Sequence, residues 1–248
     1  MMKRIIVFMI ITVLPICLLA DKQLPVQRSE QEQNNWCWAG STRAIINRHG
    51  TWVEQCAIVN WLFGRTDCCT KPSSSACNQG ASSSGADEHA VLEHWGIDST
   101  RRNRSLTKSE IDTEISAGRP FYFRWEWDGG NSGHGLVGVG ETGNGDGVYY
   151  IDPWLGSSGG FHWGLRSWMV DGDNHEWDHS IETNNNPPDD VRLRHTFMDD
   201  DWDYRASGDI TAEDFDITDG DTTFKGDAIY LREGFRARSG SYFRAYLN

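Results

Sequence analysis

The chain has 248 residues, of which 38% are hydrophobic and 12 are tryptophans, a composition that excludes an intrinsically disordered chain. Its formal net charge is −13, with 23 Lys and Arg against 36 Asp and Glu. Binding to phosphates needs clustered cations, so this balance argues against nucleic acid and against an anionic membrane surface as partners. The length suits one sizeable domain with a small appendage.

The first twenty residues have the pattern of an export signal. Lys3 and Arg4 precede an apolar run that leads to Ala20, a small residue at a suitable cleavage site. Because the run is short for a membrane-spanning helix, we expect residues 1–20 to be removed. The mature protein is then expected to be secreted or held at the cell surface, with no membrane span. An uncleaved anchor is the alternative.

A nucleophile is predicted at the start of the first helix of the mature chain. Residues 38–48 contain no proline and carry Ala44 and Ile45 on an apolar face, which indicates a helix. Cys37 would lie in the first turn, where unpaired amides and the positive end of the helix dipole favour a thiolate. Gln31 could turn its side-chain amide back beside the thiol and, with the Cys37 backbone amide, stabilise an oxyanion.

Tryptophans flank this cysteine on both sides. Trp36 and Trp38, together with Trp154 later in the chain, predict apolar subsites for a substrate. The alternative interpretation is that Cys37 is a small buried side chain between tryptophans of the core.

Four of the five cysteines that follow the signal crowd into 22 positions rich in Ser, Gly and Asn. In an exported protein this clustering favours disulfides. Cys68 and Cys69 are adjacent and do not pair easily with each other, so each is expected to bond to Cys56 or Cys77, with both pairings open. A zinc site is disfavoured because the paired C-x-x-C spacing is missing, and we predict no metal and no other cofactor. Cys37 is left as the unpaired thiol.

The pattern then turns from helix to strand. Thr107 and Glu110 form a capping box for a helix that ends near Gly118. Residues 121–127 follow as a strand with aromatic side chains on one face.

One of the eight histidines lies in a catalytic context. His134 opens a glycine-punctuated apolar strand, and a turn with Asn-Gly and Asp-Gly pairs leads to the strand 148–151, which predicts a β-hairpin. Asp152 closes that second strand, so both side chains are expected at the same rim, with Asp152 setting the tautomer of the imidazole. His49 is expected at a helix end and His89 and His94 on a helix. The remaining four fall in polar, irregular stretches without the spacing of metal ligands, namely His162, His175, His179 and His195.

The end of the chain reads as a linker followed by a small module. Residues 184–207 contain an Asn-rich run and the acidic cluster 199–203, which lacks the spacing of a calcium loop and predicts a solvated acidic linker. Residues 208–248 alternate short β-like runs with Gly and Asp turns, which suggests stacked short strands.

Together these motifs resemble the papain-like cysteine peptidases, in particular the bacterial branch with the AvrRpt2-type effectors and the C39-like enzymes. The resemblance spans roughly residues 24–165. It implies an α+β, papain-like two-layer fold for residues 21–183, with a helical half and an antiparallel β half. Residues 208–248 separately resemble a small β-rich C-terminal module of exported bacterial proteins, and we expect them to form a small all-β extension. Gly40 departs from the pattern, since related bacterial sequences often carry Ala there. The motifs that carry the resemblance are Gln31 with Cys37-Trp38-Ala39, Gln55-Cys56, Cys68-Cys69, Cys77-Asn78, Gly133-His134 and Asp152-Pro153-Trp154.

The resemblance implies a role for each site residue. Cys37 would be the nucleophile, His134 the general base and then acid, Asp152 the residue that orients the imidazole, and Gln31 the oxyanion donor. The prediction is an exported cysteine peptidase that acts on a protein or peptide substrate. Two alternatives stay open, a transglutaminase-like acyl transferase and a catalytically silent binding or toxin-associated protein on the same scaffold.

Overall fold

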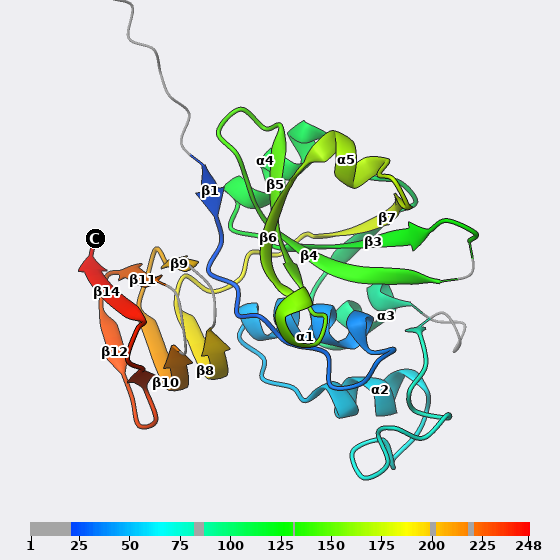
Figure 1. Ribbon diagram of the computed structural model, residues 1–248, viewed down its shortest axis with the longest axis horizontal. Coiled ribbons are helices and arrows are strands. Elements are labelled where there is room, and N and C mark those ends of the chain that lie inside the picture. The colour runs from blue at the N-terminus through cyan, green and yellow to red at the C-terminus, as the bar shows by residue number, and fades with distance from the viewer. Residues whose placement is uncertain (1–20, 82–86, 131, 199–201, 218–220) are drawn as a thin grey trace, which may run out of the picture.

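The computed structural model describes residues 21–81, 87–130, 132–198, 202–217 and 221–248, so the predicted export signal lies outside the described residues. Figure 1 shows helices gathered beside a curved sheet and a smaller all-β part at the C-terminal end. No helix within the described ranges has the length and apolar character needed to cross a membrane. The helices are α1 (Cys37–Arg48), α2 (Gln55–Leu62), α3 (Glu88–His94), α4 (Lys108–Ser116) and α5 (Arg166–Val170).

A single antiparallel sheet forms the β half. Its strand order is β2-β7-β3-β4-β5-β6, and the short strand β1 also pairs with β4. His175 and His179 lie on β7 and are buried, whereas the sequence placed them in an irregular stretch. Strong cross-strand pairing and aromatic neighbours outweigh the polar composition of this segment. The strands are β1 (Lys22–Gln23), β2 (Ser99–Arg102), β3 (Phe121–Trp127), β4 (Gly133–Glu141), β5 (Gly147–Asp152), β6 (Gly160–Leu165) and β7 (His175–Thr183).

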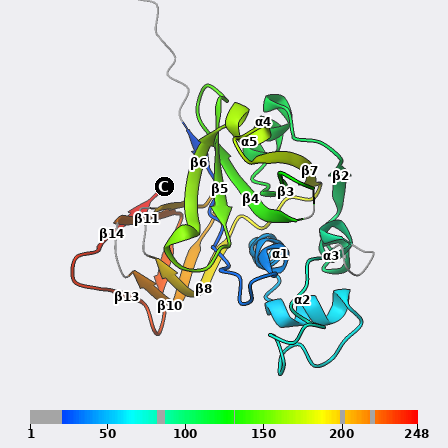
Figure 2. The ribbon, with the colours of Figure 1, turned by 45° about the vertical axis from the view of Figure 1, so that its right-hand side comes forward.

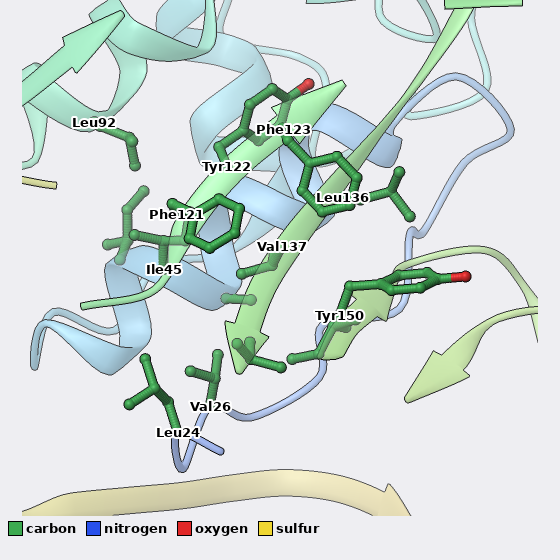
Figure 3. Close-up of a cluster of buried hydrophobic side chains, with 14 of the residues drawn as sticks. Leu24, Val26, Ile45, Leu92, Phe121, Tyr122, Phe123, Leu136, Val137 and Tyr150 are labelled. Atoms are coloured by element: carbon green, nitrogen blue, oxygen red, sulfur yellow. The ribbon is translucent and has the colours of Figure 1, made fainter. Parts of the chain in front are cut away.

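Strand β4 lies at the centre of the molecule and is buried on both faces. Helix α1 packs across it, as the two ribbon views show (Figures 1 and 2). Ile45 of α1 and Val137 of β4 are fully buried, and Leu24 and Val26 of the N-terminal segment close the core at its edge (Figure 3). The two-layer α+β plan predicted from the sequence is therefore confirmed.

Local sequence signals fix the elements around this core. Thr107 and Glu110 form the predicted capping box at the start of α4. Gly118, just beyond that helix, has a φ of 77°, which a residue with a side chain rarely adopts. The hairpin of β4 and β5 also forms as predicted, with Val137 paired to Ile151.

Two disulfides hold the segment between α2 and α3. They join Cys56 to Cys69 and Cys68 to Cys77, which is one of the two pairings that the sequence left open. Cys37 carries the free thiol. The loop is anchored to the start of α1, because the indole of Trp36 donates to the carbonyl of Cys77 at 2.9 Å.

The C-terminal part is a stack of three coils of parallel strands. Ile210 of β10 pairs with Val191 of β8 on one side and Ile229 of β12 on the other, and β11 lies between β9 and β14 in the same way. Phe215 and Phe224 fill the interior. The strands are β8 (Val191–Met198), β9 (Trp202–Arg205), β10 (Ile210–Ile217), β11 (Asp221–Gly226), β12 (Ile229–Leu231), β13 (Arg236–Ala237) and β14 (Tyr242–Leu247).

The stacked strands begin earlier than the sequence suggested. Strands β8 and β9 lie within 184–207, where an acidic linker or extension was predicted, so the interpretation as a linker is wrong. Val191 and Leu193 are buried while Arg192 is exposed, the alternation of a strand with one face in a core. The acidic residues between these strands obscured that alternation, and residues 199–201 of the cluster lie outside the described residues.

Replacing Cys68 and Cys77 together by serine is expected to lower the free energy of unfolding by roughly 2 to 4 kcal/mol, because the disulfide restricts the unfolded chain. Urea unfolding followed by tryptophan fluorescence measures the change. Ser73→Ala, at an exposed position of the same loop, is the control and should leave the midpoint nearly unchanged. A double variant that unfolds at the same urea concentration as the parent would contradict a stabilising role for this bond.

Candidate active site

The hairpin of β4 and β5 brings a histidine and an aspartate into contact. His134 is the second residue of β4 and Asp152 the last of β5, and the register of the two strands makes them diagonal neighbours. The Nε2 atom of His134 lies 2.7 Å from Oδ1 of Asp152. The imidazole is buried, at 4% exposure, so little water competes for this hydrogen bond.

Cys37 approaches the same imidazole from helix α1. It is the first residue of that helix, it is partly exposed, and its side chain hydrogen-bonds to His134. Since Asp152 engages Nε2, the nitrogen left for the thiol is Nδ1. Trp36 at the N-cap offers no side-chain hydrogen bond to the helix, so the amides of the first turn stay available to a negative charge.

Close contacts set the position of α1 against β4. The Ser41 hydroxyl donates to the carbonyl of Gly135 at 2.9 Å, which ties the cysteine helix to the residue after His134. A Cβ atom on Gly40 would lie 2.8 Å from the Ser29 carbonyl oxygen and 3.1 Å from Cβ of Pro153. Gly40 therefore lets the helix lie close to Ser29 and Pro153. These contacts join remote segments, and no local sequence signal announces them.

The imidazole is held in its charged form. Burial by itself lowers the pKa of His134, but the hydrogen bonds to Asp152 and Cys37 and the charges of both groups outweigh it and raise the pKa from 6.5 to about 10. His134 is therefore an imidazolium at neutral pH. A cation directly beside a cysteine sulfur is the arrangement that stabilises a thiolate.

Two tryptophans enclose the imidazole. Trp127 at the end of β3 stacks on His134 with ring centroids 6.3 Å apart and planes at 20°, and Trp154 meets it edge-on at 5.5 Å and 75°. Trp154 is 43% exposed, and its contact with a substrate stays a prediction. The sequence placed Trp127 only on the face of a strand, and its contact with His134 follows from the β3–β4 pairing.

The prediction that Trp36 and Trp38 line substrate subsites is wrong. Both side chains are buried, at 0% and 1% exposure. Their indole N–H groups donate to backbone carbonyls of the disulfide-bonded loop, at Cys77 and Gln79 respectively. The two tryptophans therefore support the helix start that carries Cys37 and leave no surface for a substrate.

Gln31 lies in the turn that leads to α1. Its Nε2 donates to the carbonyls of Gln33 at 2.9 Å and Asn34 at 3.0 Å, and its backbone amide donates to Pro153 at 2.7 Å. The side chain is buried. A role as oxyanion donor requires one of these N–H groups to be shared with the substrate oxygen.

A central antiparallel sheet, a helix that starts at a free thiol, and a histidine–aspartate pair on the facing hairpin define a papain-like cysteine peptidase. The family described as the papain-like cysteine protease AvrRpt2 matches residues 19–168, and the chain belongs to that family. The protein is therefore a cysteine-type peptidase, and its substrate is a protein or peptide.

Among solved structures, a protein described as a C39-like peptidase from Bacillus anthracis is similar to this chain. The identity is 15%, the match covers 68% of this chain and 99% of the other, and the TM-score is 0.41. No curated protein matches the chain.

Asp152→Asn is expected to move the alkaline limb of the pH dependence of kcat/KM to lower pH by roughly one to three units, the usual effect of removing an opposite charge at this distance. Asp152 favours the imidazolium, so replacing its carboxylate by the neutral amide of asparagine should let His134 lose its proton at a lower pH. Initial rates on a peptide substrate between pH 5 and pH 11 measure the limb. Asp128→Asn, a change in the turn after β3, is the control and should leave the limb in place. An unshifted limb in Asp152→Asn would contradict this view of the pair.

Proposed function

We propose that this peptidase cleaves peptide bonds with a Cys37–His134–Asp152 triad. The observation that carries the proposal is the hydrogen bonding of one buried imidazole to Asp152 on one side and to the free thiol of Cys37 on the other. Geometry of this kind couples a nucleophile to its base and the base to its orienting group.

In the first step, the Cys37 sulfur attacks the carbonyl carbon of the scissile peptide. The carbonyl electrons move onto oxygen, and the resulting oxyanion is stabilised by the Cys37 backbone amide, with Gln31 as the second donor once an N–H is released from its turn. His134 then gives its Nδ1 proton to the amide nitrogen as the C–N bond breaks. The amine product leaves and a thioester to Cys37 remains.

In the second step, neutral His134 takes a proton from water, and the oxygen of that water attacks the thioester carbonyl. Collapse of this second oxyanion breaks the C–S bond and releases the carboxylic acid product. The proton on His134 and the thiolate of Cys37 are thereby restored. Asp152 keeps the imidazole oriented and charged through both steps and does not itself transfer a proton.

His134→Ala is expected to reduce kcat/KM by a factor of roughly 10² to 10⁴, because the variant has no group to protonate the leaving amine. Cys37→Ala should remove turnover altogether. Cleavage of a casein or quenched-peptide substrate gives the rate, and circular dichroism checks the fold. His94→Ala, which changes an exposed histidine on α3, is the matched control and should retain activity. Cleavage by Cys37→Ala at the parental rate would overturn the triad.

Two further assays separate the alternative functions from peptide hydrolysis. If an added primary amine is incorporated into the substrate faster than the peptide is hydrolysed, the triad serves acyl transfer. If Cys37 fails to react with iodoacetamide at neutral pH in the folded protein, the scaffold is catalytically silent and serves in binding.

We also propose that the protein is exported after removal of residues 1–20. The two disulfides support this, because such bonds persist in oxidising compartments. Intact mass spectrometry of the protein recovered from the medium or cell surface is expected to give a chain that starts at Asp21. A full-length chain with reduced Cys56 and Cys77, recovered only from the cytoplasm, would contradict export.

A further inference from the structure

A buried chain of polar side chains lies on the face of β4 opposite to the imidazole. The Tyr122 hydroxyl donates to Oε1 of Glu88 at 2.8 Å, and Oε2 of Glu88 lies 3.8 Å from Nε2 of His179. Nδ1 of His179 lies 3.1 Å from Oδ2 of Asp178, which also accepts a 2.7 Å hydrogen bond from Arg124. These five residues, from α3, β3 and β7, are called the Tyr122 network below.

Three polar side chains of the network are buried, and hydrogen bonds within the network offset the loss of water. Tyr122, Glu88 and His179 are 0%, 6% and 4% exposed. A buried polar group needs a hydrogen-bond partner, and the Tyr122 hydroxyl supplies one to the Glu88 side chain. Burial, then the charge of Glu88 and then that of Cys37, raises the pKa of the Tyr122 hydroxyl, which therefore keeps its proton and serves as a donor. The geometric link to the helix that carries Cys37 runs through Gly135, which lies against the Tyr122 hydroxyl and accepts a hydrogen bond from Ser41 of α1.

Two members of the network press against the backbone on either side of the catalytic histidine. A Cβ atom on Gly133 would overlap the guanidinium of Arg124, and one on Gly135 would overlap the Tyr122 hydroxyl. Side chains alternate along a strand, so both glycines face the network while His134 faces Asp152. The space that two side chains of β4 would fill is therefore taken by Arg124 and Tyr122.

We propose that the Tyr122 network positions the catalytic imidazole, an inference that rests on the proposed function. Tyr122 and Arg124 are fixed by their hydrogen bonds and form a rigid support for the backbone of residues 133–135. This support holds His134 within reach of Cys37 and Asp152 together. Tyr122 and Arg124 are positioning residues, since they act through His134 and do not reach the reacting atoms.

Tyr122→Phe tests the proposal with the smallest change, because it removes only the donor to Glu88. We expect kcat to fall about tenfold with KM unchanged within twofold, since a displacement of well under 1 Å suffices for such a loss. The alkaline limb of the rate profile should also move to lower pH, because a displaced imidazole is held less firmly by Asp152. Alkylation of Cys37 by iodoacetamide requires the thiolate, so its onset should move to higher pH, because a displaced imidazolium stabilises the thiolate less.

Other titratable or charged groups also influence the pH of the alkaline limb, so the test variant must leave them unchanged. The groups that face His134 or the network from the elements packed around them are Cys37 on α1, Glu88 on α3, Arg124 on β3, Tyr150 and Asp152 on β5, and Asp178 and His179 on β7. Tyr122→Phe leaves all of these residues unchanged.

Tyr204→Phe is the matched control, because it removes the hydroxyl of an equally buried tyrosine in the C-terminal coils. It should lose stability without a change in kcat or in the alkaline limb. Arg124→Gln is the second network variant, suited to the case in which Tyr122→Phe does not fold, since the Arg124 side chain is partly exposed. It should shift the limb in the same direction.

The outcomes distinguish this inference from the proposed function. If Tyr122→Phe and Arg124→Gln keep the parental kcat and alkaline limb while Cys37→Ala is inactive, the network inference is overturned and the triad stands. If the parent cleaves no peptide, the triad proposal fails, and the alkylation profile of Cys37 alone decides the inference. Unchanged alkylation profiles in both variants then overturn it, and shifted profiles support it.

Discussion

The contact between helix α1 and strand β4 is the constraint on which the rest of the structure depends. Cys37, the proposed nucleophile, belongs to the helix and His134 to the strand, so the proposed chemistry requires the two elements to meet. The Ser41–Gly135 hydrogen bond joins the two elements directly, and Gly40 lets the helix lie close to Ser29 and Pro153. Arg28 extends the restraint to the loop after Asp152 by donating to the carbonyl of Trp154 at 2.7 Å. The catalytic groups are thus held by backbone contacts from three remote segments.

Strand β4 separates two polar systems inside an otherwise apolar core. The imidazolium of His134 lies on one face, and the Tyr122 network on the other. An apolar core alone would not keep a buried cation, because burial favours the neutral ring; the charge persists because Asp152 accepts from it. The disulfide-bonded loop completes the support from the helical half, where the indoles of Trp36 and Trp38 tie it to the start of α1. Stability and chemistry are therefore supplied by the same few contacts.

Features with a local cause were predictable from the sequence. The capping box at Thr107, the helix that begins at Cys37 and the hairpin that joins His134 to Asp152 each follow from neighbouring residues, and all three are present. Features that depend on distant partners were not predictable. Trp36 was assigned to the substrate because its burial depends on the disulfide-bonded loop, and the choice between two cysteine pairings depends on how that loop folds. The stacked coils were missed at β8 because this strand is stabilised by pairing with β10 of the next coil, which the local sequence does not indicate.

The protonation state of the His134 imidazole tests the central claim most directly. Nitrogen-15 NMR of the folded protein at pH 7.5 distinguishes an imidazolium from a neutral ring at His134. The structure predicts that both ring nitrogens carry a proton and that the resonance begins to titrate only as the pH approaches about 10. A neutral ring at pH 7.5 that titrates near its ordinary value of 6.5, in a protein whose Cys37 thiol is free, would contradict a charged cysteine–histidine pair.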